Sequence, residues 1–225
     1  MAAEREEGQS RTRGAQTLAR GLRVLKFVAA ADDGVTIGQV ADFAQIHRSM
    51  AYRILEALVD SALVTRAASG RYYGASGLLA LGRGGYAGLR QAGLEPVQTA
   101  ANQLGVTLAL LVAEGAAGRE NATAVLVCAP ATLGFHITFA EGSSHPLHLG
   151  AAGAALTAIL EGGPLETHYT TYGEVEPYMY GLAVPVVLGG SAPAACLVAI
   201  SQRETDPERF VPVMTQAVEQ IVTES

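Results

Sequence analysis

The chain of 225 residues contains little that could support common cofactor chemistry. Its one lysine, Lys26, falls within a helical pattern, and the sequence contains no Gly-x-x-x-x-Gly-Lys-Ser/Thr motif. A P-loop needs that motif to bind phosphates, and a Schiff-base cofactor needs a reactive lysine. We therefore exclude P-loop nucleotide hydrolysis and expect no Schiff-base cofactor.

Cysteines and long apolar runs are also scarce. Cys128 and Cys196 lie in apolar, β-branched surroundings, and two cysteines make no disulfide framework. No apolar run approaches the roughly 18 residues that a transmembrane helix needs, and the polar N-terminus has no signal-peptide core. We expect a soluble cytoplasmic protein with buried thiols and no membrane partner.

Charge is limited in amount and unevenly distributed. Charged residues make up 16% of the chain and hydrophobic residues 49%, which is typical of a folded globular protein long enough for two small domains. The net charge is −6, but residues 1–90 carry 12 basic and 8 acidic side chains, whereas residues 91–225 carry 3 and 13. Binding to phosphates needs only local positive charge, so the N-terminal part is compatible with nucleic acid.

The most informative stretch is residues 36–60, where the pattern predicts two short helices joined by a tight turn. Within the second helix, over residues 47–60, apolar side chains recur at helical spacing on one face: Ala51, Ile54, Leu55 and Leu58. The opposite face collects Arg48, Ser49, Tyr52 and Arg53. Such donors near a helix N-terminus are typical of a recognition helix in a DNA major groove. The alternative is a solvated face on which Arg53 pairs with Glu56.

The neighbouring segments favour the DNA-binding interpretation. Thr36 and Gln39 have the spacing of a capping box at the start of the first helix. After the second helix, residues 62–66 and 71–73 read as two strands joined by the turn 67–70. Two helices followed by a two-stranded wing, with Arg71 near its tip, predict a winged helix-turn-helix.

Four separate segments carry a resemblance to a known family. Residues 16–25 (QTLARGLRVL), 49–58 (SMAYRILEAL), 70–74 (GRYYG) and 78–82 (LLALG) together resemble the IclR family of bacterial transcriptional regulators. Gln45 stands where the family has a turn glycine, and His47 where it has a proline. The resemblance implies a DNA-binding regulator without enzymatic activity or cofactor, more often a repressor. It also implies a homodimer or dimer of dimers on an operator.

We expect DNA contacts from the recognition helix, the wing and the helices around them. The residues of this predicted site are Arg20, Thr36, Arg48, Ser49, Tyr52, Arg53, Arg71 and Tyr72.

The order of predicted elements gives an α+β protein with several parts. We expect a disordered arm over residues 1–15, the winged helix-turn-helix over 16–75, a glycine-rich linker helix over 76–92 and an effector-binding domain over 93–225. The first helix should face its core with Leu18, Leu22, Leu25 and Ala29, together with Gly21 and Val28.

The C-terminal domain is predicted as a sheet layered with helices. Its helices should cover residues 95–104, 150–160 and a last segment that begins at Asp206-Pro207. Its strands should cover residues 106–113, 122–129, 135–140, 180–188 and 194–201. The family resemblance implies that this domain is GAF-like, with a mostly antiparallel sheet.

A small-molecule site is expected ahead of the helix 150–160. Its N-terminus presents free N–H groups to an anion, and the family places a pocket for a small organic acid there. The predicted effector residues are His148, Gly150, Ala151, Met179, Gly181, Ala199 and Ser201. Ser201 matches a family hydroxyl, but Ala199 and Gly181 lack the polar groups of acid-binding members. We therefore expect a more apolar or aromatic ligand, or a vestigial pocket, with Tyr169, Tyr172, Tyr178 and Tyr180 as candidate walls.

Two further interpretations of the C-terminal part stay open but are weaker. His145 and His148, with His136 and Glu141, could suggest a metal site, but no third ligand stands at fixed spacing, so we predict no metal. Ser143 or Ser144 lacks the surroundings of a nucleophile. At the level of the whole protein, the alternatives are a winged-helix protein-interaction module and an enzyme built on the C-terminal domain.

Overall fold

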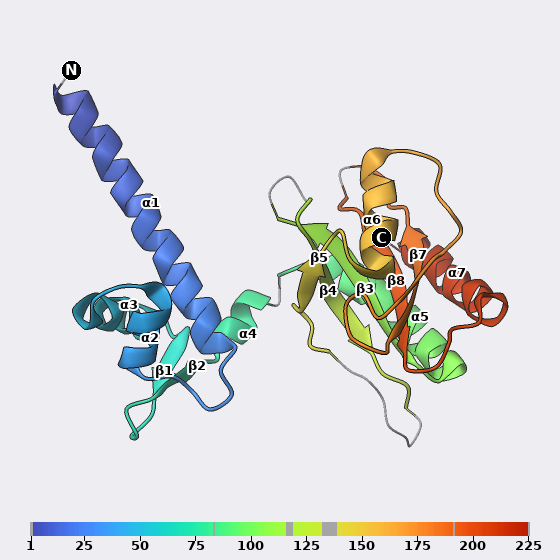
Figure 1. The fold of residues 1–225 in the computed structure, drawn as a ribbon, viewed down its shortest axis with the longest axis horizontal. Helices are drawn as coiled ribbons and strands as arrows, with labels where there is room; N and C mark the ends of the chain where they lie inside the picture. The colour runs from blue at the N-terminus through green and yellow to red at the C-terminus, as the bar shows by residue number, and fades with distance from the viewer. Residues whose placement is uncertain (1, 83, 116–118, 132–138, 191, 225) are drawn as a thin grey trace. The chain divides into compact units, whose positions relative to one another are not determined.

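The computed structural model describes residues 2–82, 84–115, 119–131, 139–190 and 192–224. The chain divides into two compact units, Met1–Gly85 and Tyr86–Ser225 (Figure 1). The first unit contains α1 (Ala2–Ala29), α2 (Ile37–Ala44), α3 (Arg48–Asp60), β1 (Val64–Arg66), β2 (Tyr72–Gly74) and α4 (Gly77–Gly82). The second contains α5 (Ala87–Leu104), β3 (Thr107–Glu114), β4 (Asn121–Cys128), β5 (Ser144–Pro146), α6 (Gly150–Glu161), β6 (Tyr169–Tyr172), β7 (Tyr180–Val186), β8 (Ala195–Ser201) and α7 (Pro207–Glu224).

In the first unit, α2 and α3 form the helix-turn-helix as expected. Thr36 caps α2 with a full capping box, in which its hydroxyl accepts from the backbone of Gln39 and the Gln39 side chain returns to the Thr36 N–H. The turn between the helices passes through Gln45, which has a left-handed backbone (φ 54°, ψ 50°). This is the position at which the family resemblance gives a turn glycine, so here a residue with a side chain adopts a conformation that glycine adopts more easily.

The core of this unit differs from the expected one on α1. Val24 and Val28 are completely buried, whereas Leu18 and Leu22 are 64% and 51% exposed. Of the predicted stripe, Val28 is confirmed and Leu25 packs against the core, whereas Leu18, Leu22 and Ala29 were wrong because all three are exposed. Two adjacent faces of α1 are apolar, and the sequence period alone does not say which of them meets the core.

The N-terminal arm also needs correction. Residues 1–15 were expected to lack regular structure, but α1 extends back to Ala2. The segment is rich in alanine, glutamate and arginine, which favour helix, so propensity supports this extension despite the lack of an apolar period.

The segment between the units is not one helix. We expected a linker helix over residues 76–92, but α4 ends at Gly82 and α5 begins at Ala87, with a turn at residues 84–86. Glycines lower helix stability here, and Tyr86 adopts a left-handed backbone (φ 54°). The Tyr86 hydroxyl donates to Glu114 at 2.8 Å, which joins the start of α5 to the end of β3. Burial and this hydrogen bond raise the pKa of Tyr86 to about 12.

The second unit is built on a six-stranded antiparallel sheet with the order β5-β4-β3-β8-β7-β6. α5 and α7 cover one face, with Val97, Phe210, Met214 and Ile221 in the core, and α6 covers the other through its alanines and Leu156 (Figure 1). Because both faces are covered, β3 is buried from Thr107 to Ala113 without the alternation of a half-exposed strand. The structure therefore confirms the expected α+β fold with a helix-layered, antiparallel sheet.

Two strands, β5 and β6, were not anticipated from the sequence. β5 is short and β6 has an exposed tyrosine, Tyr172, so neither has a strong apolar pattern. Most of the strand predicted over residues 135–140 lies outside the described residues. Over the described ranges, no helix is both long and apolar enough to cross a lipid bilayer.

Candidate nucleic-acid interface and ligand pocket

The first unit has a groove of about 580 Å³ between the N-terminal ends of α2 and α3 and the turn of the wing. It is lined by Thr36, Ile37, Gly38, Arg48, Ser49, Tyr52 and Gly70. Four of the predicted DNA-binding residues therefore lie together here: Thr36, Arg48, Ser49 and Tyr52.

The two arginines of α3 are exposed to solvent and could contact a ligand. Ala51, Ile54 and Leu55 are buried on the core side of the helix, which leaves Arg48 and Arg53 on the solvent side. Neither arginine forms an ion pair in the described part of the chain, so the pairing of Arg53 with Glu56 does not occur there. An unpaired guanidinium on an exposed helix face can bind phosphate or the O6 and N7 atoms of guanine.

The wing residues behave differently from the expectation. Arg71 donates from Nη1 to the backbone oxygen of Gly34 at 2.8 Å and to that of Asp33 at 3.4 Å, so its guanidinium fastens the wing to the loop after α1. Tyr72 is completely buried, and its hydroxyl has no hydrogen-bond partner among the described residues. The prediction that Tyr72 contacts DNA was therefore wrong, because strand alternation turns its side chain into the core.

An aromatic cluster supports the arginines of α1, and sequence analysis missed it. The rings of Phe27 and Phe43 stack with centroids 4.2 Å apart, and the guanidinium of Arg23 lies 5.6 Å from the Phe43 ring. Phe43 is still 41% exposed. Arg20 lies on the exposed surface one turn before Arg23. The only signal in the sequence is an apolar residue, Phe43, off the core stripe of α2.

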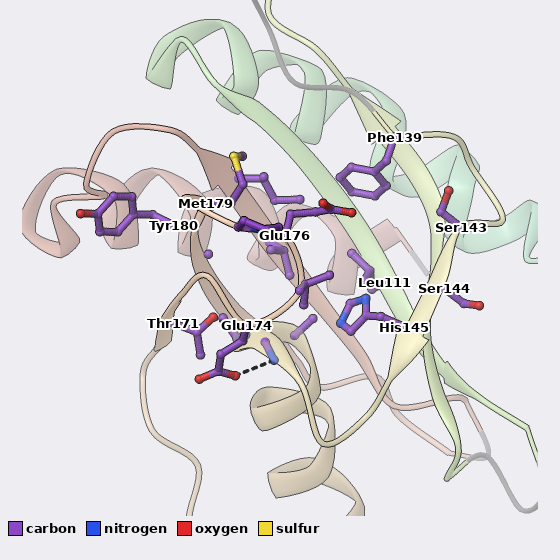
Figure 2. Close-up of a pocket in the computed structure, with 18 of the residues that line it drawn as sticks. Leu111, Phe139, Ser143, Ser144, His145, Thr171, Glu174, Glu176, Met179 and Tyr180 are labelled. Carbon is purple, nitrogen blue, oxygen red and sulfur yellow. Dashed lines mark hydrogen bonds between the residues drawn. The ribbon is translucent and has the colours of Figure 1, made fainter.

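The second unit has a cavity of about 450 Å³ between α6, β7, β8 and the loop that follows β6 (Figure 2). Its wall includes Leu111, Phe139, Ser143, Ser144, His145, Gly150, Ala151, Ala152, Thr171, Glu174, Val175, Glu176, Pro177, Met179, Tyr180, Gly181, Val198, Ile200 and Gln202. Of the predicted effector residues, Gly150, Ala151, Met179 and Gly181 line it.

The predicted residues of β8 lie on the wrong face of the sheet. Gly181 pairs with Ile200 across the ladder, and both line the cavity together with Val198. Ala199 belongs to the core on the α5 and α7 side, and the Ser201 hydroxyl accepts from the backbone of Arg203. A shift of one residue exchanges the faces of a strand, which is why Ala199 and Ser201 are excluded from the cavity wall.

Most of the other predicted wall residues do not line the cavity, and Tyr180 is the one of the four predicted tyrosines that its described wall includes. His148 is exposed and does not line it. Tyr178 is 78% exposed, and the Tyr172 ring packs against that of Tyr180 in a tilted arrangement, with ring centroids 4.5 Å apart and an interplanar angle of 42°. Figure 2 shows the Tyr180 ring directed away from the cavity. Tyr169 packs against the core under α6. Apolar side chains of the sheet and of the loops, and not these tyrosine rings, therefore form most of the wall.

The N-terminus of α6 is already occupied by side chains of the same unit. The N–H of Gly150 donates to Oε2 of Glu174 at 2.9 Å (Figure 2). The N–H of Ala151 donates to the hydroxyl of Thr171 at 2.9 Å. Gly150 has φ +75°, and a side chain there would collide with Val175. The free N–H groups expected for an anion are thus paired with an internal carboxylate and a hydroxyl.

His145 is the titratable residue most affected by this environment. Its ring projects into the cavity from β5 (Figure 2), and its Nε2 is buried without a hydrogen-bond partner among the described residues. Burial lowers the pKa of His145, and a hydrogen bond with the backbone of Leu149 opposes this effect. The imidazole is therefore neutral at pH 7, with Nε2 free to interact with a ligand.

No cluster of three or more histidine, cysteine or acidic side chains that could hold a metal occurs within the described ranges. His136 lies outside them. The prediction of buried thiols is confirmed, because Cys128 and Cys196 are 2% and 0% exposed and unbridged. Burial raises the pKa of both thiols, which keeps them protonated and unreactive.

Comparison with known proteins finds a match for part of the first unit. Residues 17–68 match the model of the IclR helix-turn-helix domain. This range covers the end of α1, both helices of the helix-turn-helix and the first strand of the wing. No curated protein matches the chain by sequence.

Solved structures share the fold over nearly the whole chain. An IclR transcriptional regulator from Alicyclobacillus acidocaldarius is 18% identical with a TM-score of 0.75, and the match covers 93% of this chain and 98% of that one. An IclR homolog from Microbacterium hydrocarbonoxydans, solved with 4-hydroxybenzoate, is 19% identical with a TM-score of 0.77 over 92% and 98%. Thermotoga maritima IclR is 14% identical with a TM-score of 0.68 over 93% and 98%.

Proposed function

The chain carries an IclR helix-turn-helix domain within the fold of IclR transcriptional regulators, and from this premise we propose that it represses transcription by binding operator DNA. The observation that supports this most directly is the exposed guanidinium face at the start of α3. Arg48, Ser49 and Tyr52 line one groove with the wing turn, and Arg53 lies exposed on the same helix. A groove of this kind accepts a phosphate backbone while α3 reads base edges.

The division of charge agrees with this role. Residues 1–90 are net positive and residues 91–225 strongly negative, so electrostatic attraction to DNA is concentrated in the first unit. In this proposal, Arg48 and Arg53 contact bases or phosphates. Arg20 and the remaining N–H groups of Arg71 contact the adjacent backbone.

The proposed assembly is a homodimer or a dimer of dimers. Leu79 and Leu81 of α4 are 73% and 65% exposed, and Leu18 and Leu22 of α1 are also exposed. Leucines in such numbers on two helices of a small unit are typical of a surface covered by another subunit. Two copies would present two α3 helices to two half-sites of a palindromic operator.

We propose the cavity of the second unit as the effector site that modulates operator binding. The cavity lies within the roughly 300 to 1,000 Å³ range of small-molecule sites and is walled mainly by apolar groups with a few polar ones. The similar fold that holds 4-hydroxybenzoate in the Microbacterium homolog supports a small metabolite as the ligand class here.

The function is tested by selecting bound duplexes from fragmented genomic DNA and measuring their affinity by fluorescence anisotropy at several salt concentrations. We expect one palindromic sequence to be enriched, with affinity that falls steeply as salt rises. Enrichment of no sequence, together with affinity that does not depend on salt, would reject DNA binding. That result would favour the alternative of a winged-helix protein-interaction module.

A further inference from the structure

The cavity of the second unit differs in charge from a site built for an organic acid. Its described wall contains two carboxylates, Glu174 and Glu176, and no arginine or lysine. The sequence segments outside the described residues of this unit add none, because residues 116–118, 132–138, 191 and 225 contain neither type. A carboxylate ligand would therefore find no cation in the wall with which to form an ion pair.

The basic side chains of this unit are used elsewhere. Arg90 pairs with Glu141, Arg119 donates to the backbone oxygen of Leu160, and Arg209 donates to that of Leu104. Arg203, the remaining one, is exposed and does not line the cavity. Recruiting any of the first three would break an existing hydrogen bond or ion pair.

The helix terminus cannot replace the missing cation. The N–H groups of Gly150 and Ala151 already donate to Glu174 and Thr171, each at 2.9 Å. An incoming carboxylate would have to displace Glu174 and would then lie beside another negative charge. Like charges a few ångströms apart repel each other, most strongly where water is excluded.

The same wall suits a ligand with the opposite charge. Figure 2 shows the carboxylate of Glu176 extending over the cavity toward Phe139, and the His145 ring projecting in from β5. Nε2 of His145 is buried and lacks a partner among the described residues, so it can accept a hydrogen bond from an N–H donor. Leu111, Val198 and Ile200 supply an apolar floor.

We propose that this cavity binds an organic cation, a primary amine on an apolar or aromatic body, with Glu176 as its ion-pair partner. The proposal rests on the assignment of the cavity as the effector site. The apolar body lies over the floor and near Phe139, and the ammonium group faces the acidic loop after β6. His145 Nε2 accepts an N–H hydrogen bond from the ligand.

The test is calorimetric titration of the full chain, without DNA, with probes that differ in the charged or polar group on one aromatic body. These are 2-phenylethylamine, the neutral 2-phenylethanol and the anionic 3-phenylpropanoate, which carry an ammonium, a hydroxyl and a carboxylate on the same 2-phenylethyl group, followed by a series of longer aromatic and aliphatic primary amines. We expect at least one amine to bind, at least tenfold more tightly than its matched acid, with the alcohol between them. An acid that binds as tightly as its amine, or failure of all the amines at millimolar concentration, overturns the proposal.

Two variants test whether the carboxylate of Glu176 is the ion-pair partner of the amine. Glu176→Gln should lower amine affinity at least tenfold and leave alcohol affinity unchanged, because only the charge is removed. Glu166→Gln, at an exposed carboxylate outside the cavity wall, should change neither. Equal amine affinity in Glu176→Gln and the native protein would remove Glu176 from the site and with it the proposal.

Failure here is distinguishable from failure of the proposed regulator function. Operator selection and anisotropy measure DNA binding without ligand, and calorimetry measures ligand binding without DNA. Operator binding without amine binding would reject only the cation assignment, and amine binding without operator binding would reject only the regulator role.

Discussion

The two units handle charge in opposite ways. In the first unit, Arg48 and Arg53 are exposed and unpaired over the described residues, and the core beneath them is apolar. In the second, Glu174 is tied to a helix terminus and Glu176 extends over a cavity, while three of the four arginines are engaged with other groups. A surface with exposed, unpaired arginines suits a polyanion, and a cavity with an available carboxylate suits a small cation. Net charge of the whole chain conceals both features.

The largest effect should come from disturbing the scaffold of the second unit at Gly153. A side chain there would overlap the backbone oxygen of Leu147, so Gly153→Ala should destabilise this unit by about 3 kcal/mol, at the upper end of overpacking costs. Urea unfolding followed by circular dichroism should show one transition shifted and the other unchanged. Gly88→Ala is the control, because a Cβ at Gly88 meets nothing within 4 Å. Two units that shift together would contradict their independence.

A smaller but functional effect is expected at the recognition helix. Arg53→Ala should weaken binding to the selected operator by about 1 to 3 kcal/mol if its guanidinium contacts a guanine. Arg203→Ala, an exposed arginine of the second unit, is the matched control and should leave affinity unchanged. Native affinity in Arg53→Ala would remove Arg53 from the interface.

A second arginine, on the wing, should act without regard to sequence. Arg71→Ala should weaken binding to all DNA sequences alike and reduce the slope of log affinity against log salt concentration by about one.

A substitution in the turn of the helix-turn-helix should change the unfolding free energy of the first unit by about 1 kcal/mol. Gln45 has φ 54°, a conformation that costs a residue with a side chain about 1 to 2 kcal/mol, whereas glycine loses about 0.5 to 1 kcal/mol in backbone entropy. Gln45→Gly should therefore raise the unfolding free energy of the first unit by up to about 1 kcal/mol. Ala57→Gly, at an exposed helical position, should lower it by about 0.5 to 1 kcal/mol. Destabilisation by Gln45→Gly would mean that its side-chain hydrogen bond to Asp42 outweighs the strain.

The smallest expected effect is a pH dependence that arises from His145. Its pKa is lowered by burial, so the unfolded chain binds a proton more readily than the folded one, and stability falls as pH drops below about 6.5. Urea unfolding of the second unit at pH 7.5 and pH 5 should show this loss, and His145→Gln should reduce it. The exposed His148→Gln is the control. An identical pH dependence in His145→Gln and the native protein would assign the loss to other groups.

The sequence predicted the first unit better than the second because its signals are local. The capping box at Thr36, the apolar period of α3 and the spacing of the wing strands each lie within a few residues. The faces of α1 and β2 were harder to assign. Val24 and Tyr72 are buried because of contacts with α2, α3 and β1, which no local period specifies.

In the second unit, the strands that bear the cavity were found, but their facing residues were not. β7 and β8 were predicted within about two residues, yet the cavity wall takes Val198 and Ile200 instead of Ala199 and Ser201. Strand pairing fixes that choice, and pairing is a long-range property. Glu174 was missed for a similar reason, since its contact with Gly150 joins residues that are 24 positions apart.

The contact between Glu174 and the first turn of α6 has a consequence for how ligand preference could change. One carboxylate there is part of the cavity wall and also accepts a hydrogen bond from the first N–H of α6, so replacing it should alter the stability of the domain along with any ligand preference of the cavity. The side chain of Glu176, two residues later, forms no hydrogen bond or ion pair with the described residues. New chemical preferences are therefore most readily acquired at position 176, while position 174 stays constrained by the architecture it completes.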